Sequence, residues 1–193
     1  MLEPLEPKHC LELIEAASDG ELWRLWYTAI PEPAKMHAEI ERRIDLQAKG
    51  TMFPFAVRSI ALNRIVGMTT YMNIDATHKR VEIGSTWYAR SVQRTPLNTE
   101  CKLLLLTHAF EILDCMAVEF RTSYFNYTSR NAILRLGAKQ DGILRSHQRH
   151  ADGSLRDTCV YSIIATEWPA VKQHLTYQLA RPREAGLNPG SEA

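Results

Sequence analysis

The stretch VEIGSTWYARSVQRTPLNTECKLLLLTHAF, from Val81 to Phe110, decides the fold of this chain. Residues Val81 to Ala89 are rich in β-branched and aromatic types and include no proline, which predicts a strand. From Thr99 to Leu113 apolar residues recur with the helical period, which predicts a buried helix. The polar segment between them, Gln93 to Asn98, ends where that helix begins. Because backbone N–H groups without partners converge at a helix N-terminus, this segment is a candidate anion site. The apolar positions that define the helix face are Leu103, Leu106, Phe110 and Leu113.

Further helices and strands are predicted on both sides of this stretch. The other predicted helices span Lys8–Ala17, Ala34–Lys49, Asn126–Leu136 and Glu167–Leu179. The other predicted strands span Leu2–Leu5, Met52–Ser59, Ile65–Asn73, Ala117–Tyr124, Gly142–Gln148 and Leu155–Ala165. This order of elements predicts one α+β domain over residues 1–180, built on a mixed sheet. Residues 181–193 are expected to form a flexible tail.

The composition is that of an ordinary globular domain, and it narrows the classes of function. The chain has 193 residues, of which 45% are hydrophobic and 23% charged. Its formal net charge of +1 argues against binding nucleic acid through a general basic surface. The four cysteines show no C-x-x-C spacing, and we expect buried free thiols in a reducing, cytoplasmic compartment. The polar N-terminus and the lack of a long apolar run predict no membrane span. His147 and His150 have no neighbouring ligands in the sequence, so we expect no metal site.

Four short motifs follow one another along the chain. Glu82-Ile83-Gly84 lies in the predicted strand of the opening stretch, and Gln93 begins the loop QRTPLN, which leads into Asn98-Thr99-Glu100. A later segment reads N-x-x-S-x-x-x-x-x-x-L-G-A from Asn126 to Ala138, and the last predicted strand contains DTCVYSI. With these motifs the chain resembles the GNAT superfamily of acyl-CoA-dependent N-acetyltransferases. Within it the chain looks like the RimJ/RimL branch, which includes N-terminal acetyltransferases of ribosomal proteins. Pro96 and Asn98 stand where the family's loop, Q/R-x-x-G-x-G/A, has a glycine and a small residue.

The resemblance implies the GNAT fold, an α/β/α-layered α+β domain in which helices flank a twisted mixed sheet of about seven strands. Such a sheet splays between its fourth and fifth strands, and the pantetheine arm of acetyl-CoA, the implied co-substrate, lies in the splay. In this chain the arm would run beside Thr86, Trp87 and Tyr88. The other implied cofactor-binding residues are Gln93, Arg94, Thr95, Leu97, Asn98, Thr99, Asn126, Ser129 and Arg130. Arg135 is a further candidate for the phosphates, with a solvated helix face as the alternative.

Acyl transfer to an amine requires a base for the amine proton and hydrogen-bond donors for the oxyanion. Glu82 is the candidate base, acting directly or through a water molecule. A carboxylate in a strand of apolar and small residues can have its pKa raised toward neutrality. The alternative is a strand-edge glutamate that faces solvent. The candidate oxyanion donor is the backbone N–H of Tyr88.

The group that protonates the departing thiolate is not evident from the sequence. Many GNAT members use a tyrosine seven residues after the asparagine of the later motif, and that position here is Ile133. The resemblance offers Ser129 instead, whose hydroxyl would lie near the CoA sulfur. Both Ser129 and Asn126 also suit helix capping, and the two roles can coexist.

The acceptor amine is the part of the reaction that the sequence describes least. Two groups of residues are expected to border its cleft, although core packing for the aromatics and a surface position for the histidines are alternatives. These groups are Trp23, Trp26 and Tyr27 near the first helices, and Arg145, His147 and His150 in the last hairpin. The function predicted is acetyl transfer to a primary amine, either a protein N-terminus or a small molecule. The alternative is a non-catalytic acyl-CoA-binding protein or sensor, and a homodimer or larger homo-oligomer stays open.

Overall fold

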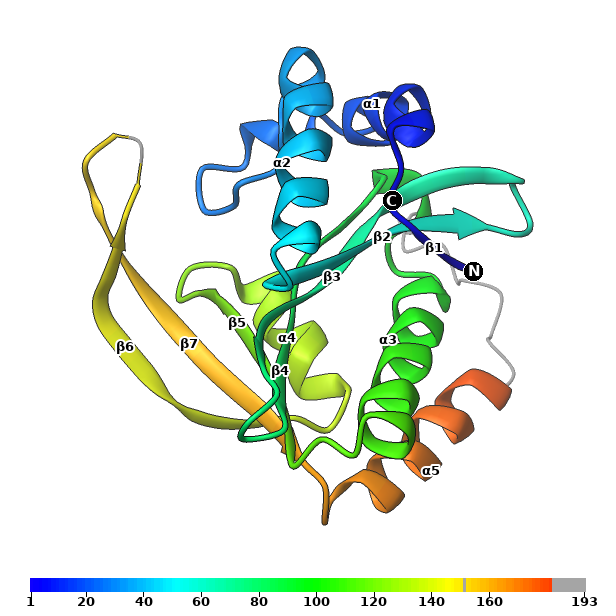
Figure 1. The fold of residues 1–193 in the computed structure, drawn as a ribbon, viewed down its shortest axis with the longest axis vertical. Coiled ribbons are helices and arrows are strands. Elements are labelled where there is room, and N and C mark those ends of the chain that lie inside the picture. Colours follow the sequence, from blue (N-terminus) through cyan, green and yellow to red (C-terminus); the bar gives the residue numbers. More distant parts are fainter. Residues whose placement is uncertain (151, 182–193) are drawn as a thin grey trace, which may run out of the picture.

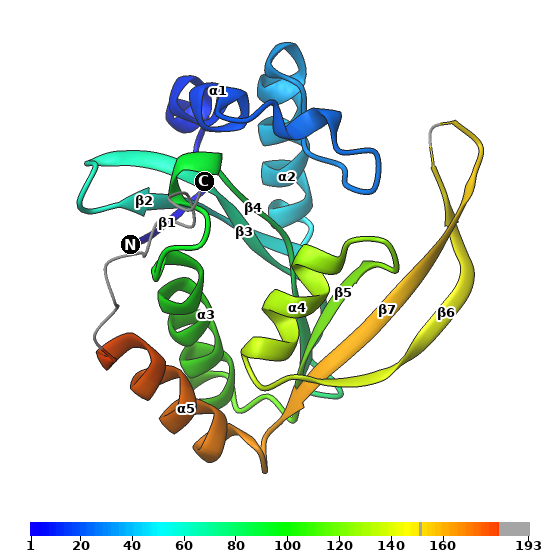
Figure 2. The ribbon, with the colours of Figure 1, turned by 180° about the vertical axis from the view of Figure 1, so that it is seen from behind.

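The computed structural model describes residues 1–150 and 152–181, which form a seven-stranded mixed sheet with helices packed against it (Figures 1 and 2). The predicted tail therefore lies, apart from Arg181, outside the described residues. The strands are β1 (Leu2–Pro4), β2 (Met52–Ser59), β3 (Arg64–Asp75), β4 (Arg80–Tyr88), β5 (Ala117–Ser123), β6 (Lys139–Arg149) and β7 (Leu155–Ile164). The α-helices are α1 (Cys10–Ser18), α2 (Met36–Ala48), α3 (Leu97–Thr107), α4 (Tyr127–Arg135) and α5 (Trp168–Ala180). The predicted fold class and the seven-stranded sheet are confirmed.

The strand order is β1-β2-β3-β4-β5-β7-β6, and every neighbouring pair is antiparallel except β4 and β5. A parallel pair needs a crossover connection, and α3 supplies it. The parallel pairing is short, since it joins Arg80–Glu82 only to Ala117–Glu119. Beyond Glu82, β4 pairs with β3 alone among the described strands. The sheet is therefore open between β4 and β5 along the second half of β4.

Two hydrophobic clusters hold the helices to the sheet. The first joins α3, α4 and α5 to β4, β5 and β7, with Leu106, Phe120 and Tyr161 fully buried. The second joins α1 and α2 to β2, β3 and the end of β4, with Leu13, Met36 and Met68 at its centre. In both views α1 and α2 lie at one end of the molecule, while α3 and α5 lie at the other (Figures 1 and 2). Residues of α3 and β4 contribute to both clusters.

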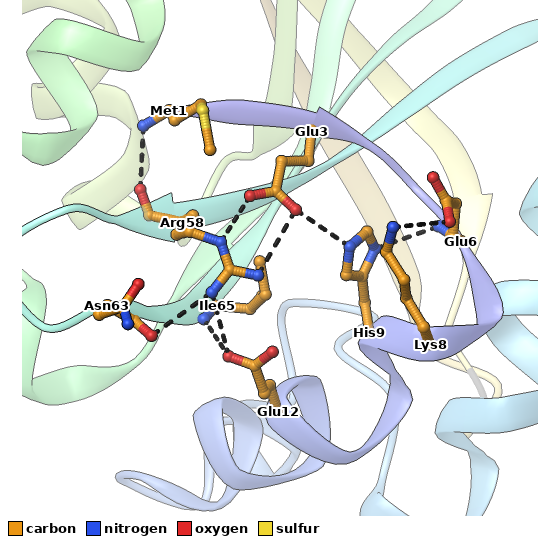
Figure 3. Close-up of polar contacts among 9 residues, drawn as sticks. All are labelled: Met1, Glu3, Glu6, Lys8, His9, Glu12, Arg58, Asn63 and Ile65. Atoms are coloured by element: carbon orange, nitrogen blue, oxygen red, sulfur yellow. Dashed lines mark hydrogen bonds and ion pairs between the residues drawn. The ribbon is translucent and has the colours of Figure 1, made fainter.

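A polar network ties the N-terminal segment to the sheet (Figure 3). The Glu3 carboxylate accepts hydrogen bonds from Arg58 of β2 and lies 3.2 Å from Nε2 of the buried His9. The Glu12 carboxylate of α1 accepts a hydrogen bond from the Ile65 backbone N–H at 2.7 Å. These contacts fix where α1 lies on β3, and therefore where the α1–α2 connection begins.

The predicted helix from Thr99 to Leu113 is wrong at both ends. The helix starts at Leu97, and after Thr107 the chain continues as a π-helical turn, His108–Ile112. A π-helical turn holds more residues than an α-helical one, so the side chains after it lose the α-helical phase. Leu113 is consequently 47% exposed, although the period placed it on the buried face. Cys10 also differs from expectation, because it is partly exposed while the other three free thiols are buried.

The core position of Leu106 gives a direct test of this packing. Leu106 is fully buried between α3 and the sheet, whereas Leu104 on the same helix is 54% exposed. We expect Leu106→Ala to lower the free energy of unfolding by about 2–5 kcal/mol, because truncation leaves a cavity. Leu104→Ala is the matched control and should change it by less than about 0.5 kcal/mol. Equal effects in denaturant unfolding would contradict the arrangement of α3.

Candidate active site

A β-bulge reshapes β4 where the sheet opens. Thr70 of β3 pairs with Gly84, but Met68, two residues away, pairs with Trp87, three residues along β4. The extra residue is accommodated at Ser85, whose φ of 48° is left-handed. Gly67 allows the strands to approach here, because a Cβ at that position would lie 2.1 Å from the Trp87 carbonyl oxygen. The bulge lies just beyond the point where β4 stops pairing with β5, and no pattern in the sequence predicted it.

Glu82 is buried at the last position of β4 that pairs with β5, with only 5% of its surface exposed. It is therefore not the solvent-facing strand residue that the sequence left open. Its Oε2 accepts a hydrogen bond from Asn73 Nδ2 at 2.7 Å and lies 3.7 Å from Nε of Arg121. Burial raises the pKa of Glu82, and this outweighs the opposite effects of Asn73 and Arg121. A buried carboxylate with a raised pKa at the open edge of the sheet is suited to take up a proton.

Two arginines that the sequence did not single out lie around Glu82. Arg121 of β5 donates from Nη2 to both carboxylate oxygens of Glu119, at 3.1 and 3.3 Å. Arg156 of β7 donates from Nη1 to Gln148 Oε1 at 2.7 Å, and its charge acts on the pKa of Glu82. The Nε atoms of both arginines are buried without a hydrogen-bond partner among the described residues. Both Nε atoms are enclosed within the fold, and that of Arg121 faces the Glu82 carboxylate.

The segment predicted as an anion site leads into the N-terminus of α3. The helical ladder starts with the bond from the Glu100 N–H to the Pro96 carbonyl at 3.0 Å, so the N–H groups of Asn98 and Thr99 precede it. Pro96 occupies the N-cap position, where its lack of an N–H removes no donor from the first turn. The Leu97 N–H is 3.4 Å from Thr95 Oγ1.

The rest of the loop is held by its own contacts. Gln93 donates from Nε2 to the Tyr88 carbonyl at 2.9 Å, and the Thr95 hydroxyl donates to the Val92 carbonyl at 2.7 Å. Arg94 is exposed and has a left-handed φ of 60°. The loop therefore keeps its shape through Gln93 and Thr95, while the Arg94 side chain is open to solvent beside the helix N-terminus.

Arg135 and Arg130 of α4 have different surroundings. Arg135 donates from Nη1 to Thr99 Oγ1 at 3.2 Å, which places its guanidinium at the N-terminus of α3. Arg130 instead donates to the Tyr161 hydroxyl at 3.1 Å and to the Tyr124 carbonyl at 3.0 Å, and it lies over the Tyr124 ring. Of the two arginines, Arg135 lies at the N-terminus of α3, whereas Arg130 was predicted from the sequence as a cofactor-binding residue and Arg135 as a further candidate. A cofactor role for Arg130 stays a prediction.

The remaining predicted site residues lie at β4 and at the start of α4. Trp87 and Tyr88 are buried in the second cluster, and Thr86 is half-buried at the bulge. Burial raises the pKa of the Tyr88 hydroxyl, which has no hydrogen-bond partner among the described residues. Asn126 Oδ1 accepts a hydrogen bond from the Ser129 N–H at 3.0 Å, so Asn126 is the N-cap of α4. Whether Asn126 and Ser129 also contact CoA stays a prediction.

Aromatic residues from three connections meet around Trp26. The Trp26 ring lies 5.5 Å from His150 at the end of β6 and 5.6 Å from Phe125, which precedes α4. Trp26 is 58% exposed, so it is not a core residue, whereas Trp23 packs against the second cluster. Arg145 and His147 contact β7 through Asp157 and Thr158. The α1–α2 connection and the tip of the β6–β7 hairpin thus form one rim.

The raised pKa of Glu82 has a consequence for stability that can be measured. The folded protein holds this proton more tightly than the unfolded chain, so stability falls as the pH rises from about 4.3, the usual glutamate value, through the folded pKa. Glu82→Gln mimics the protonated form and should melt at a higher temperature than the wild type at pH 7. The difference should disappear below about pH 4, where Glu82 is protonated in both states. Glu15→Gln, on the exposed face of α1, is the control, and equal melting of all three proteins would refute the assignment.

The described residues contain no helix long and apolar enough to cross a membrane. Within the same residues, no group of three or more His, Cys, Asp and Glu side chains is placed to bind a metal ion.

Comparison with known proteins relates this site to a family. The acetyltransferase (GNAT) domain family matches residues 1–139. A GCN5-related N-acetyltransferase from Brucella melitensis is 32% identical, with a TM-score of 0.80 over 93% of this chain and 81% of that one. RimJ of Mycobacterium smegmatis, solved with a CoA-disulfide, shares the fold, with a TM-score of 0.77, 20% identity and coverage of 92% and 88% of the two chains.

A curated relative, YdaF of Bacillus subtilis strain 168, is provisionally named a ribosomal N-acetyltransferase. It is 29% identical over 108 residues, which are 56% of this chain. The match spans 58% of the length of YdaF. The resemblance to RimJ/RimL-like acetyltransferases inferred from the motifs is confirmed, and the chain belongs to the GNAT acetyltransferase family.

Proposed function

We propose that this protein transfers the acetyl group of acetyl-CoA to a primary amine by direct attack in a ternary complex. The observation that carries the proposal is the buried Glu82, whose pKa is raised, at the point where β4 separates from β5. Membership of the GNAT family supports acetyl-CoA as the donor. Amine acylation requires a base within reach of the amine proton, and Glu82 lies where the sheet opens.

Features at both ends of the opening fit CoA. At one end, the N–H groups of Asn98 and Thr99 and the guanidinium of Arg135 would bind the diphosphate, with Arg94 nearby. Along the opening, the edge of β4 from Thr86 to Tyr88 lacks a partner strand among the described residues, so its backbone can hydrogen-bond the pantetheine arm. The loop residues Gln93, Thr95 and Leu97 complete this proposed cofactor site, together with Trp87, Asn126, Ser129 and Arg130.

The chemistry requires one bond to form and one to break. The amine nitrogen forms a C–N bond with the acetyl carbonyl carbon, and the C–S bond of the thioester breaks. Glu82 accepts the proton that an ammonium acceptor must lose, either directly or through a water molecule. The backbone N–H of Tyr88 donates to the oxyanion, and the Ser129 hydroxyl donates to the sulfur. The second proton leaves the nitrogen as the amide forms, and the thiolate gains a proton to become free CoA.

A protein N-terminus is the acceptor that the site favours. The rim formed by Trp26, Phe125 and His150 offers apolar surface to the side chains that follow the N-terminus. The name of YdaF, a ribosomal N-acetyltransferase, supports the same class of acceptor.

Replacing the proposed base separates catalysis from binding. We expect Glu82→Gln to lower turnover by about 10²–10⁴-fold, the usual contribution of a general base, with CoA affinity unchanged. Release of free thiol from acetyl-CoA, screened over amines and N-terminal peptides, measures turnover, and calorimetry measures binding. If the wild type binds acetyl-CoA but acetylates no amine, and Glu82→Gln changes nothing, the protein is a non-catalytic acyl-CoA-binding protein.

Replacing Arg135 tests the anion site without touching the proposed base. Arg135→Ala removes a charged hydrogen-bond donor, and such bonds contribute about 1.5–3 kcal/mol. The Kd for CoA should therefore rise by about tenfold or more. Arg149→Ala, on the exposed β6 strand, is the matched control and should leave the Kd unchanged. Unchanged affinity in Arg135→Ala would remove this residue from the site.

A further inference from the structure

Lys102 of α3 is a buried cation whose charge no nearby group neutralises. It is 5% exposed, and no carboxylate of the described residues forms an ion pair with it. Its Nζ donates to Thr69 Oγ1 at 3.1 Å and to Thr86 Oγ1 at 2.8 Å. Burying an ammonium without a counter-charge is costly, and two neutral hydroxyls compensate only part of the cost. The position of this cation therefore calls for an explanation.

A second buried cation, also beside β3, is neutralised by a carboxylate, which is the usual arrangement for a buried charge. Arg43 of α2 donates from Nη1 to Thr70 Oγ1 at 2.8 Å, so neighbouring residues of β3 each bond a buried cation. Arg43 is also paired with Glu39, whose Oε1 lies 2.7 Å from its Nε. The charge of Arg43 is neutralised within the fold, whereas that of Lys102 is not.

Of the two threonine hydroxyls that Lys102 bonds, one belongs to Thr86 at the opening of the sheet. Thr69 Oγ1 and Thr86 Oγ1 lie 2.8 Å apart, so one of the two hydroxyl protons bridges them. If Thr69, which is fully buried, supplies the bridging proton, the proton of Thr86 is free to donate elsewhere. Its other acceptor in the fold is the Gly84 carbonyl at 3.4 Å, which is a long bond. Thr86 is half-buried at the bulge, where the proposed pantetheine site begins.

We propose that Lys102, acting through the Thr86 hydroxyl, is a positioning residue that stabilises the thiolate of CoA in the opening between β4 and β5. This inference rests on the proposed function. It explains how the thiolate can depart although Ile133, at the position of the usual tyrosine acid, is buried in the first cluster. A thiolate stabilised by a buried cation does not need prompt protonation.

The ionisation of the neighbouring groups agrees with this role. Burial lowers the pKa of Lys102 to about 8, so the ammonium form still predominates at neutral pH. Cys101 on the same helix and Tyr88 on β4 have their pKa values raised by burial, so both stay neutral there. Arg43, which bonds Thr70 on β3, is a further cation beside this strand, and Arg121 and Arg156 are cations near Glu82. None of these groups supplies the missing negative charge.

The pKa of the CoA thiol, bound to the protein, tests the inference without any acceptor amine. Thiolate absorbance is followed against pH for the CoA complex, and the complex with desulfo-CoA is subtracted to remove tyrosine and cysteine signals. An opposite charge a few ångströms away lowers a pKa by about 1–3 units. We expect the bound thiol of the wild type to titrate at least about one unit below free CoA. In Lys102→Met and in Thr86→Val the shift should be lost, whereas Lys102→Arg should keep part of it.

The controls separate this inference from the proposed function. Lys172→Met removes an exposed lysine of α5 that is paired with Glu111, and it should leave the thiol pKa unshifted from the wild-type value. If Lys102→Met fails to fold, Thr86→Val carries the same comparison. A wild type that binds CoA with the thiol pKa of free CoA, or a shift that survives in both variants, would overturn the role of Lys102 alone. A wild type that binds no CoA would overturn the proposed function as well.

Discussion

The short parallel pairing of β4 with β5 is the constraint on which the rest of the structure depends. Only Arg80–Glu82 and Ala117–Glu119 are joined, and the β-bulge at Ser85 follows where this pairing has ended. The core is divided into two hydrophobic clusters, and β4 contributes residues to both. Backbone groups along an opening must be satisfied from outside the sheet, so the short pairing creates a place for an extended ligand.

Charged and polar groups lie beside this opening, and burying the charged ones lowers the stability of the fold. Glu82 lies at its closed end, the N–H groups of Asn98 and Thr99 lie at its other end, and Lys102 lies between them along α3. Functional sites commonly contain buried ionisable groups whose pKa values are shifted. In the function that we propose, these groups serve the proton, the thiolate and the diphosphate. In the same proposal, the aromatic rim around Trp26 borders the acceptor side.

Features that depend on local sequence could be predicted, and features that depend on strand register could not. The strand, loop and helix from Val81 to Phe110 were found because their periodicity and turn residues are local. The family motifs likewise selected Glu82 and the loop. The bulge at Ser85 was missed because it follows from how β3 and β4 pair. In the sequence Lys102 is an ordinary helix residue. Its contacts with Thr69 and Thr86 exist only because β3 and β4 pack against α3.

The choice between two arginines shows the same limit. Arg130 and Arg135 are both basic residues of one helix, and only the packing of α4 beside α3 decides which guanidinium lies at the helix N-terminus. The arginines around Glu82 come from β5 and β7, and no spacing along the chain connects them. The pairing of these strands, and not a local pattern, brings the two side chains near Glu82.

A crystal structure of the protein with CoA would test the central claim most directly. The account predicts the diphosphate within hydrogen-bond distance of the Asn98 and Thr99 N–H groups and the pantetheine arm along the free edge of β4. It also predicts the thiol end between Glu82 and Thr86. CoA bound elsewhere, or a β4–β5 opening filled by the protein's own side chains in that complex, would contradict it.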